Sequence, residues 1–390
     1  MRQAILNLEE SKIREVANAG MGREGVLPFW FGESDEVTPE PVRAAAIASL
    51  QAGETFYAHN LGQPALRQAI AGYSARLHGG VAPERIAVTS GGVNALMLAM
   101  QALIDAGDEA LVLTPVWPNL TAQPQILGAR LRCLALQPQP DGAWTLDVPA
   151  LLAAITPATR LLVLNSPNNP TGWTLSRAEQ QAILARCRET GTWILADEVY
   201  ERLYYRGDTA SGAAPSFLDV AEPDDRLVVV QSFSKSFLMT GWRLGWLVMP
   251  AAMTPHMGKL LEFNTSCAPV FVQRAALAAL AETDTITPRI VAHLRHCRDT
   301  LVPQLQALPG VHSSRAPGGM YAFLRIEGFA DSLALAKRLV AEAGLGLAPG
   351  EAFAPEASAW LRWCFASRDP ARLTEGVRRL GDWLAAQRRA

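Results

Sequence analysis

Cysteine is scarce in this sequence, and long apolar runs are missing. The five cysteines among 390 residues are scattered, odd in number and without a CxxC spacing. This argues against a disulfide framework and predicts reduced thiols in the cytoplasm. No apolar run approaches the roughly 20 residues needed to cross a bilayer. The N-terminal residues Glu9, Glu10, Lys12 and Arg14 are charged and unlike a signal peptide, so we expect a cytoplasmic protein with no membrane partner.

An excess of charge of either sign is also lacking. The formal net charge is −2 at pH 7, which gives no electrostatic basis for binding nucleic acid. The six histidines show no metal-ligand pattern. His293 and His296 lie three residues apart but have no carboxylate or cysteine partner at a useful spacing, so a surface helix is the better interpretation. We therefore expect neither a metal site nor a nucleic-acid partner.

What the sequence does contain is a large share of apolar residues, 49% against 18% charged, in a chain long enough for one large domain and a smaller one. Helical patterns alternate with short apolar runs, which predicts an α/β fold. We expect a large domain at 48–288, with a mostly parallel seven-stranded sheet covered by helices on both faces. The expected strands are Ile86–Thr89, Ala110–Leu113, Leu131–Leu136, Leu161–Asn165, Trp193–Asp197, Leu227–Gln231 and Leu244–Met249. The expected helices include Ala65–Leu77, Gly92–Ile104, Ser176–Thr190 and Val270–Ala281.

Two features refine this architecture. The last two strands are separated by too few residues for a parallel crossover, so one of them is expected to run antiparallel. After about residue 288 the pattern changes to a long helix at Thr287–Leu308, a strand around Tyr321, a helix near Ser332–Ala343, a strand at Trp360–Phe365 and a helix capped by Asp369. We expect residues 1–47 and 289–390 to form the smaller α+β domain with the N-terminal segment, which packs with it or lies over the cleft between the domains.

Lys235 is the most informative residue. It follows the apolar strand Leu227–Gln231 and stands in Ser232-Phe233-Ser234-Lys235-Ser236, with Arg243 eight residues later. A lysine at the end of a buried strand can form a Schiff base with an aldehyde cofactor, while hydroxyl and guanidinium groups hold a phosphate. The alternative is a solvated surface lysine, which the buried strand makes the poorer interpretation.

Three other strand ends carry polar or aromatic groups. Gly91, Gly92 and Val93 follow one strand and open a helix, where free N–H groups attract an anion. Trp117 follows a proline turn and can stack on a flat ring, and Asp197 can charge a ring nitrogen. Alone, these features are equally a tight turn, a core tryptophan and a helix cap.

Together these segments resemble the class I and II aminotransferases that depend on pyridoxal 5′-phosphate (PLP), the fold-type-I aspartate aminotransferase superfamily. The likeness spans about residues 26–385 and rests on the lysine segment, Asn169-Pro170-Thr171-Gly172, Asp197-Glu198-Val199-Tyr200 and the Arg362 strand. It implies a PLP cofactor. The residues it assigns to the cofactor are Gly91, Gly92, Val93, Trp117, Asn169, Asp197, Tyr200, Ser232, Ser234, Lys235 and Arg243.

The same resemblance assigns further roles. Lys235, Asp197 and Tyr200 would be catalytic, with Asn169 and Tyr200 at the phenolic oxygen of the cofactor and a cis Asn169–Pro170 bond. Gly32, Asn169 and Arg362 would bind the substrate, Arg362 by clamping its α-carboxylate, whereas a structural ion pair is the alternative for this arginine. Tyr57 would reach the cofactor phosphate of a neighbouring subunit, which implies a homodimer.

The expected activity is a ping-pong transamination between an amino acid and a 2-oxo acid. Val93 stands where aspartate-using relatives often carry a lysine, while Trp30, Phe31 and Tyr321 could line an apolar pocket. We therefore predict a neutral aliphatic or aromatic donor, with 2-oxoglutarate or pyruvate as acceptor. Arg23 or Arg315 could still reach a distal acid. The alternatives are a PLP-dependent carbon–sulfur β-lyase on the same fold and a PLP-sensing regulator, for which the acidic chain and short N-terminal segment are a poor match.

Overall fold

The computed structural model describes residues 1–389 and is built around a seven-stranded sheet with the order β2-β10-β9-β8-β7-β3-β4. Its strands are β2 (Ile86–Thr89), β3 (Glu109–Thr114), β4 (Arg130–Ala135), β7 (Thr159–Asn165), β8 (Trp193–Asp197), β9 (Leu227–Ser232) and β10 (Gly245–Val248). All seven predicted strands are confirmed, with small shifts at their ends. The fold class is therefore the predicted one.

One strand of this sheet runs against the others. β10 pairs antiparallel with both β2 and β9, whereas the remaining pairs are parallel. Only a short loop joins β9 to β10, and it holds α9 (Phe233–Ser236) and the turn η3 (Thr240–Trp242). A parallel return needs about a dozen residues or more, so the prediction of an antiparallel member is confirmed.

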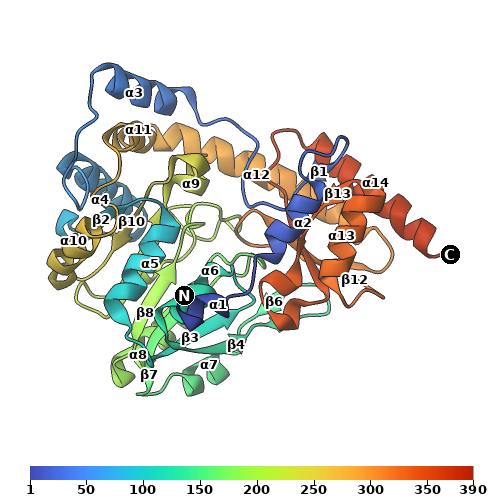
Figure 1. Ribbon diagram of the computed structural model, residues 1–390, viewed down its shortest axis with the longest axis horizontal. Helices are drawn as coiled ribbons and strands as arrows, with labels where there is room; N and C mark the ends of the chain where they lie inside the picture. Colours follow the sequence, from blue (N-terminus) through green and yellow to red (C-terminus); the bar gives the residue numbers. More distant parts are fainter. Residues whose placement is uncertain (390) are drawn as a thin grey trace.

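Both faces of the large sheet are buried. Along β7, Leu162 and Leu164 belong to one apolar core, while Leu161 and Val163 belong to a second one. Alternate side chains of a strand point to opposite faces, so this division shows a sheet covered on both sides (Figure 1). The surrounding helices are α4 (Pro64–His78), α5 (Gly92–Leu103), α6 (Asn119–Leu127), α7 (Val148–Ala154), α8 (Arg177–Thr190), α10 (Thr254–Glu262) and α11 (Val270–Ala281). A capping box of Ser176 and Glu179 opens α8.

A smaller antiparallel sheet carries the order β11-β12-β15-β14, with β11 (Val311–Ser313), β12 (Tyr321–Ile326), β14 (Ala348–Pro349) and β15 (Trp360–Cys364). It is accompanied by α12 (Thr283–Gln306), α13 (Ser332–Ala343) and α14 (Ala371–Gln387). The predicted helix Ser332–Ala343 is confirmed. The last helix starts later than predicted, with Pro370 as its N-cap, although Asp369 still accepts a hydrogen bond from the Ala371 N–H. The predicted domain boundary at residue 288 falls within α12.

The N-terminal segment divides between the two parts of the molecule. α2 (Lys12–Gly20) contacts α13, and β1 (Leu27–Pro28) pairs with β13 (Leu345–Gly346). By contrast, α3 (Glu40–Gln51) contacts α11, beside the large sheet (Figure 1). Residues 40–47 therefore do not pack with the smaller part as predicted, because the apolar side chains of α3 find their partner on α11.

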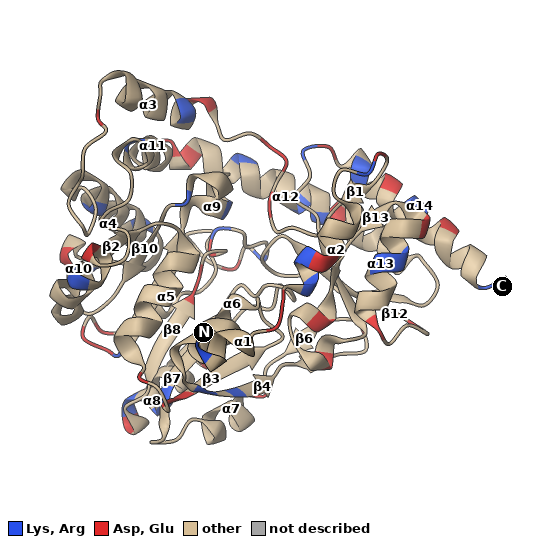
Figure 2. Cartoon of the chain, in the orientation of Figure 1, with Lys and Arg blue, Asp and Glu red and all other residues tan. Residues whose placement is uncertain are grey.

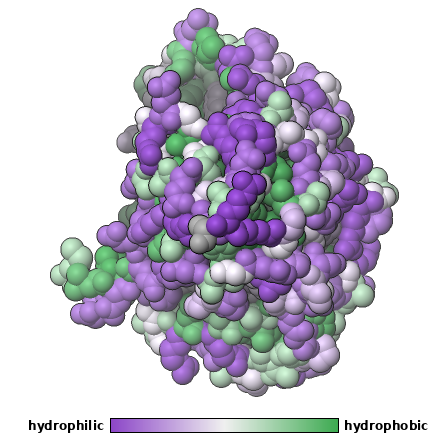
Figure 3. Space-filling model, turned by 90° about the vertical axis from the view of Figure 1, so that its right-hand side faces the viewer, coloured by the Kyte–Doolittle hydropathy of each residue, from purple (hydrophilic) through white to green (hydrophobic). Residues whose placement is uncertain are grey.

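The surface carries no dominant charge of one sign. Lys and Arg alternate with Asp and Glu along the visible elements (Figure 2), and the face that carries the C-terminal helices is mostly hydrophilic (Figure 3). Among residues 1–389, no helix combines the length and the apolar character that a membrane span requires.

Candidate active site

A cavity of about 610 Å³ opens at the carboxyl ends of β7, β8 and β9. These strands end at Asn165, Asp197 and Ser232, and all three residues line the cavity. The carboxyl ends of parallel strands are where α/β sheets bind ligands. Most predicted site residues line this one cavity: Gly32, Gly92, Val93, Trp117, Asn169, Asp197, Tyr200, Ser232, Ser234, Lys235, Arg243 and Arg362.

Lys235 lies in α9 with its amine buried in this cavity. Its Nζ donates a hydrogen bond to the carbonyl oxygen of Gly32 at 2.5 Å and lies 5.7 Å from the centroid of the Tyr200 ring. Burial lowers the pKa of Lys235 to about 8, with a smaller upward contribution from Cys364 and a further lowering by Arg362. The neutral amine that a nucleophile or base requires is therefore easier to form near neutral pH than for an ordinary lysine.

Asp197 is a buried carboxylate with few partners. Its Oδ1 accepts one hydrogen bond, from the Val199 N–H at 3.3 Å, and residues 1–389 provide no hydrogen bond to its other oxygen. Burial raises the pKa of Asp197 to about 7, although the Val199 N–H and Lys235 oppose the shift. A positively charged ligand atom in the cavity would supply the missing partner and keep this carboxylate ionised.

A set of anion donors lies at another part of the cavity. Arg243 has a left-handed backbone, with φ of 55°, and its Nη1 lies 3.5 Å from Ser234 Oγ. Ser234 Oγ in turn accepts from Ser232 Oγ at 2.9 Å. Gly91, at φ of 94°, precedes the N-terminus of α5, and a Cβ there would lie 2.5 Å from the Arg243 guanidinium. The positive φ favours glycine at this position, and the absence of a side chain lets the guanidinium lie close to the N-terminus of α5, where both can bind one anion.

Arg362, on β15 of the smaller sheet, provides a second cationic group in the cavity. Its guanidinium donates to Asn169 Oδ1 at 2.9 Å and to the Trp30 carbonyl oxygen at 2.5 Å, and it lies 4.5 Å from the Tyr321 ring centroid. No carboxylate of residues 1–389 lies within ion-pair distance of it, and its buried Nε has no hydrogen-bond partner among them. A buried guanidinium without an anion suits a ligand carboxylate better than the alternative of a structural ion pair.

Tyr200 and Tyr321 close the cavity between these two cationic groups. Their hydroxyl oxygens are 2.7 Å apart, and burial raises the pKa of Tyr321 to about 12. Both hydroxyls therefore stay protonated near neutral pH, and because one of them donates to the other, one O–H remains free to donate to a ligand oxygen. Gly32 lies so close to the Tyr321 hydroxyl that any side chain at this position would collide with it. The Asn169–Pro170 bond is cis, as predicted.

Several predicted residues do not line the cavity. Tyr57 is 90% exposed and lies away from it. The side chain of Trp30 is buried beside a neighbouring cavity of about 450 Å³ that Arg23 also lines. Arg315 lies 3.5 Å from Asp299 instead. Phe31 and Tyr321 do line the active-site cavity, so the predicted aromatic pocket is correct for two of its three residues. The prediction for Trp30 is wrong, because its side chain is buried beside the neighbouring cavity.

Arg14 is among the lining residues that sequence reasoning did not assign to the site. Arg14, on α2, extends over the cavity with its guanidinium 5.0 Å from the Phe31 ring centroid. Among residues 1–389 it has no ion-pair partner and no side-chain hydrogen bond. The only signal in the sequence was a weak one. Ser11 is a good N-cap, and it marks the start of the short helix that holds Arg14. That α2 crosses the cavity depends on its contact with α13.

Comparison with known proteins agrees with this geometry. The family model for aminotransferase class I and II matches residues 28–380. The arginine–pyruvate transaminase of Pseudomonas aeruginosa is 35% identical over 351 residues, which cover 90% of this chain and 87% of that protein. The valine–pyruvate aminotransferase of Mycobacterium tuberculosis is 34% identical over 360 residues, 91% and 90% of the two chains. The crystal structure of aspartate aminotransferase from Thermotoga maritima superposes with a TM-score of 0.89 at 31% identity, covering 99% of this chain and all of that one.

The cavity also suits the cofactor of that family. PLP needs an amine for its aldehyde, anion donors for its phosphate and a carboxylate for its ring nitrogen. The same cavity is lined by Lys235, by Ser234 with Arg243, and by Asp197, whose carboxylate still needs a cationic partner. The match over most of the chain and this donor set lead to one conclusion: the chain belongs to the class I and II aminotransferases and is a PLP-dependent transaminase.

Proposed function

We propose that the enzyme moves an amino group between a neutral L-amino acid and a 2-oxo acid in two half-reactions, with Lys235 as the residue that binds PLP. The observation that carries this proposal is the pair of buried groups in one cavity, the Lys235 amine with a pKa lowered by burial and the Asp197 carboxylate. When bound, the cofactor supplies an electron sink for the negative charge that develops at the substrate α-carbon.

Each cavity residue then has a distinct task. Asp197 pairs with the protonated ring nitrogen, while Arg243, Ser232, Ser234 and the first N–H groups of α5 hold the phosphate. Trp117 lies along the cavity wall, where it can stack on a flat ring. Once its amine is free, Lys235 moves the α-proton of the substrate as base and then as acid, a task for which its lowered pKa is suited.

Arg362 and Asn169 orient the amino acid. The guanidinium binds the α-carboxylate through its open donor edge, and Tyr321 packs beneath it at 4.5 Å. Asn169, already hydrogen-bonded to Arg362 at 2.9 Å, couples this clamp to the cofactor ring. Gly32 carries the carbonyl that accepts from Lys235, so the segment that holds it lies directly over the reacting atoms.

The donor is proposed to be neutral, aliphatic or aromatic. Val93 lines the cavity without a charge, and Phe31 adds an aromatic wall. Relatives of similar identity are named for arginine, valine and aspartate, so likeness alone does not choose among donors, and the preference for a neutral side chain rests on Val93 and Phe31.

A half-reaction screen tests the donor. Holoenzyme is mixed with single amino acids in the absence of any acceptor, and the loss of visible cofactor absorbance is followed in time. We expect leucine, methionine or phenylalanine to discharge the band faster than aspartate at equal concentration, because Val93 and Phe31 offer the donor side chain an uncharged wall, while Arg14 is assigned to the longer dicarboxylate 2-oxoglutarate. A clear preference for aspartate would contradict the neutral-donor assignment while leaving the transaminase assignment intact.

Arg14 is proposed to select the acceptor. Its unpaired guanidinium can receive the distal carboxylate of 2-oxoglutarate, which pyruvate lacks. We expect Arg14→Met, which keeps the aliphatic stem over Phe31, to raise the KM for 2-oxoglutarate roughly tenfold, as the loss of one charged hydrogen bond would.

Steady-state KM values for the two acceptors, with one donor held constant, provide the measurement. The KM for pyruvate should stay nearly unchanged and serves as the internal control. Equal effects on both acceptors would show that Arg14 acts on packing and not on the distal carboxylate.

The assembly is proposed to be a homodimer. Phe56 and Tyr57 are 82% and 90% exposed, an unusual state for two adjacent aromatic residues. A second copy of the chain would cover them and bring Tyr57 to the neighbouring phosphate site. The particle mass in solution tests this proposal, which a monomer at working concentration would contradict.

A further inference from the structure

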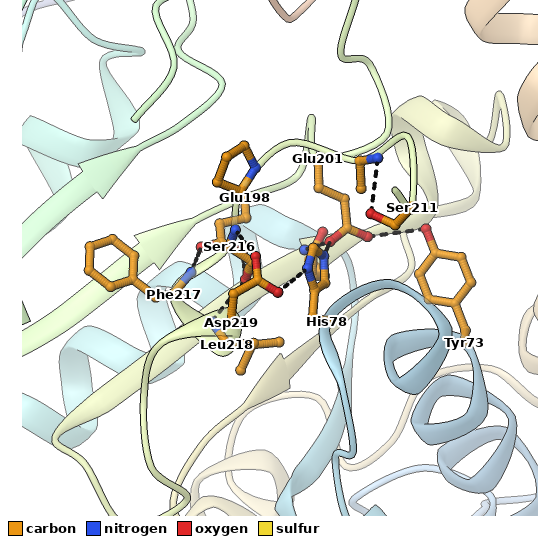
Figure 4. A network of polar contacts seen from close by, with 12 residues as sticks. Tyr73, His78, Glu198, Glu201, Ser211, Ser216, Phe217, Leu218 and Asp219 are labelled. Carbon is orange, nitrogen blue, oxygen red and sulfur yellow. Dashed lines mark hydrogen bonds and ion pairs between the residues drawn. The ribbon is translucent and has the colours of Figure 1, made fainter. Parts of the chain in front are cut away.

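The segment after β8 presents its side chains to two different environments. Asp197 and Tyr200 line the active-site cavity, whereas Glu198 and Glu201 do not. These two glutamates are 2% and 4% exposed and lie within the protein behind the cavity. Figure 4 shows them together with His78, Asp219 and Tyr73 in one polar network. We call His78, Glu198, Glu201 and Asp219 the buried charge cluster.

His78 is the cation of this cluster. It is the last residue of α4, where the negative end of the helix dipole favours a positive charge. Its Nε2 lies 2.9 Å from Glu201 Oε2 and its Nδ1 lies 3.1 Å from Asp219 Oδ1. An ionised carboxylate only accepts hydrogen bonds, so both ring nitrogens act as donors and the ring is an imidazolium. Burial alone would lower the pKa of His78, but the bonds to Asp219 and Glu201 outweigh it and raise this pKa to about 10.

The carboxyl groups of the cluster are tied to several parts of the site, and burial raises the pKa of one of them, Glu198, to about 8. Glu201 accepts from Tyr73 at 3.1 Å and from Gln231 at 2.6 Å, and Gln231 directly precedes Ser232. Glu198 accepts from Ser216 Oγ at 2.5 Å and from the Phe217 N–H at 2.9 Å. Asp219 accepts from the Ser216 N–H at 2.9 Å.

Backbone hydrogen bonds also tie Glu198 and Glu201 to neighbouring parts of the chain. The Glu198 N–H donates to the Val230 carbonyl oxygen on β9, and the Ala214 N–H donates to the carbonyl oxygen of Glu201. The other charged groups nearby are Arg202, whose guanidinium lies 6.0 Å from the Tyr73 ring centroid, and Arg177, which donates to the Asp219 backbone oxygen. Neither guanidinium forms an ion pair with a carboxylate of the cluster. His78 is thus the cation that pairs with the buried Glu201 and with Asp219, whose side chain is 20% exposed.

We propose that His78 is a positioning residue for the cofactor site: by pairing with Glu201 and Asp219 it holds the segment 197–201 so that Asp197 and Tyr200 face the cofactor. This inference rests on the proposed function of Asp197. Without the cation, the negative charges of Glu201 and Asp219 lie close together with no counter-charge. Glu201 then either takes up a proton or moves, and a movement of Glu201 displaces Asp197, which lies four residues earlier on the same segment.

The test uses holoenzyme carrying His78→Gln, whose amide keeps hydrogen bonds but no charge. We expect the cofactor dissociation constant to rise roughly tenfold and the pH midpoint of the visible cofactor band to shift, because Asp197 leaves its place. Adding Glu201→Gln removes one of the two uncompensated anions and should restore much of both properties. His312→Gln, at a solvent-exposed His312–Glu327 pair, is the matched control and should leave both unchanged.

The outcomes separate this inference from the function itself. A His78→Gln enzyme with wild-type cofactor affinity and wild-type pH midpoint, whatever its melting temperature, would overturn the positioning role. Should His78→Gln not fold, Glu201→Gln alone is measured. A smaller change in the same direction supports the proposal, and wild-type values overturn it. We expect the visible band to persist in all of these variants, so its loss on replacement of Lys235 remains an independent test of the function.

Discussion

Replacing Lys235 with alanine is expected to reduce transamination by roughly 10⁴-fold or more, because this one amine both binds the cofactor and moves the substrate proton. The visible absorbance of the bound cofactor should also be lost, although PLP should still bind through the anion donors of Arg243 and Ser234. Steady-state rates and an absorbance spectrum after adding PLP measure the two effects.

The chain offers a sharp control for this experiment. It contains only four lysines, Lys12, Lys235, Lys259 and Lys337, and only Lys235 lines the cavity. Lys259→Ala, on α10, should leave activity and spectrum unchanged. Reductive trapping of the lysine-bound cofactor followed by peptide mapping should label Lys235 alone. Retention of the visible band and of turnover in the Lys235→Ala enzyme would refute the assignment.

Replacing Asp197 with asparagine should affect activity and stability in opposite directions. Asparagine keeps the shape of the side chain but cannot hold a positive charge on the ring nitrogen. We expect turnover to fall by about 10²–10³-fold, the usual cost of removing one preorganised electrostatic group. Rates at saturating donor and acceptor give this loss directly, while unchanged cofactor content shows that the site is still filled.

The expected stability effect follows from the pKa of Asp197. This pKa is about 7 in the folded, cofactor-free chain against an ordinary value of 3.8, with burial as the main cause. Between these pH values the folded state binds the proton more strongly than the unfolded state, so stability falls as the pH rises toward 7. Replacing the Asp197 carboxyl group with an amide, which does not ionise, removes this loss of stability.

Cofactor-free Asp197→Asn should therefore be as stable as the wild type near pH 4 and more stable at pH 8. The gain is a few kcal/mol at most, because one pKa unit corresponds to about 1.4 kcal/mol. Denaturant unfolding of both cofactor-free proteins at the two pH values measures it. A variant that is less stable than the wild type at pH 8 would show that the carboxylate is satisfied without a ligand, against the argument made from its single hydrogen bond.

The strands and the chemistry at their ends were accessible from the sequence. Apolar runs such as Leu227–Gln231 report local burial, and the strands that they form end at residues that line the cavity, Asn165, Asp197 and Ser232. The link between β9 and β10 is too short for a parallel crossover, so its length alone predicted that one of these two strands runs antiparallel. The orientation of Glu198 away from the cavity, by contrast, left no mark in the motif Asp197-Glu198-Val199-Tyr200.

The sequence by itself therefore determined the sheet, the family and the residues that follow each strand, since local patterns encode these. Only the tertiary structure decided that Arg14 extends over the cavity, that Trp30 turns away from it, and that His78 meets Glu201 across 123 residues of chain. These contacts depend on how α2 and α4 pack against distant elements. Packing joins surfaces that are remote in sequence, so no local pattern along the chain records the result.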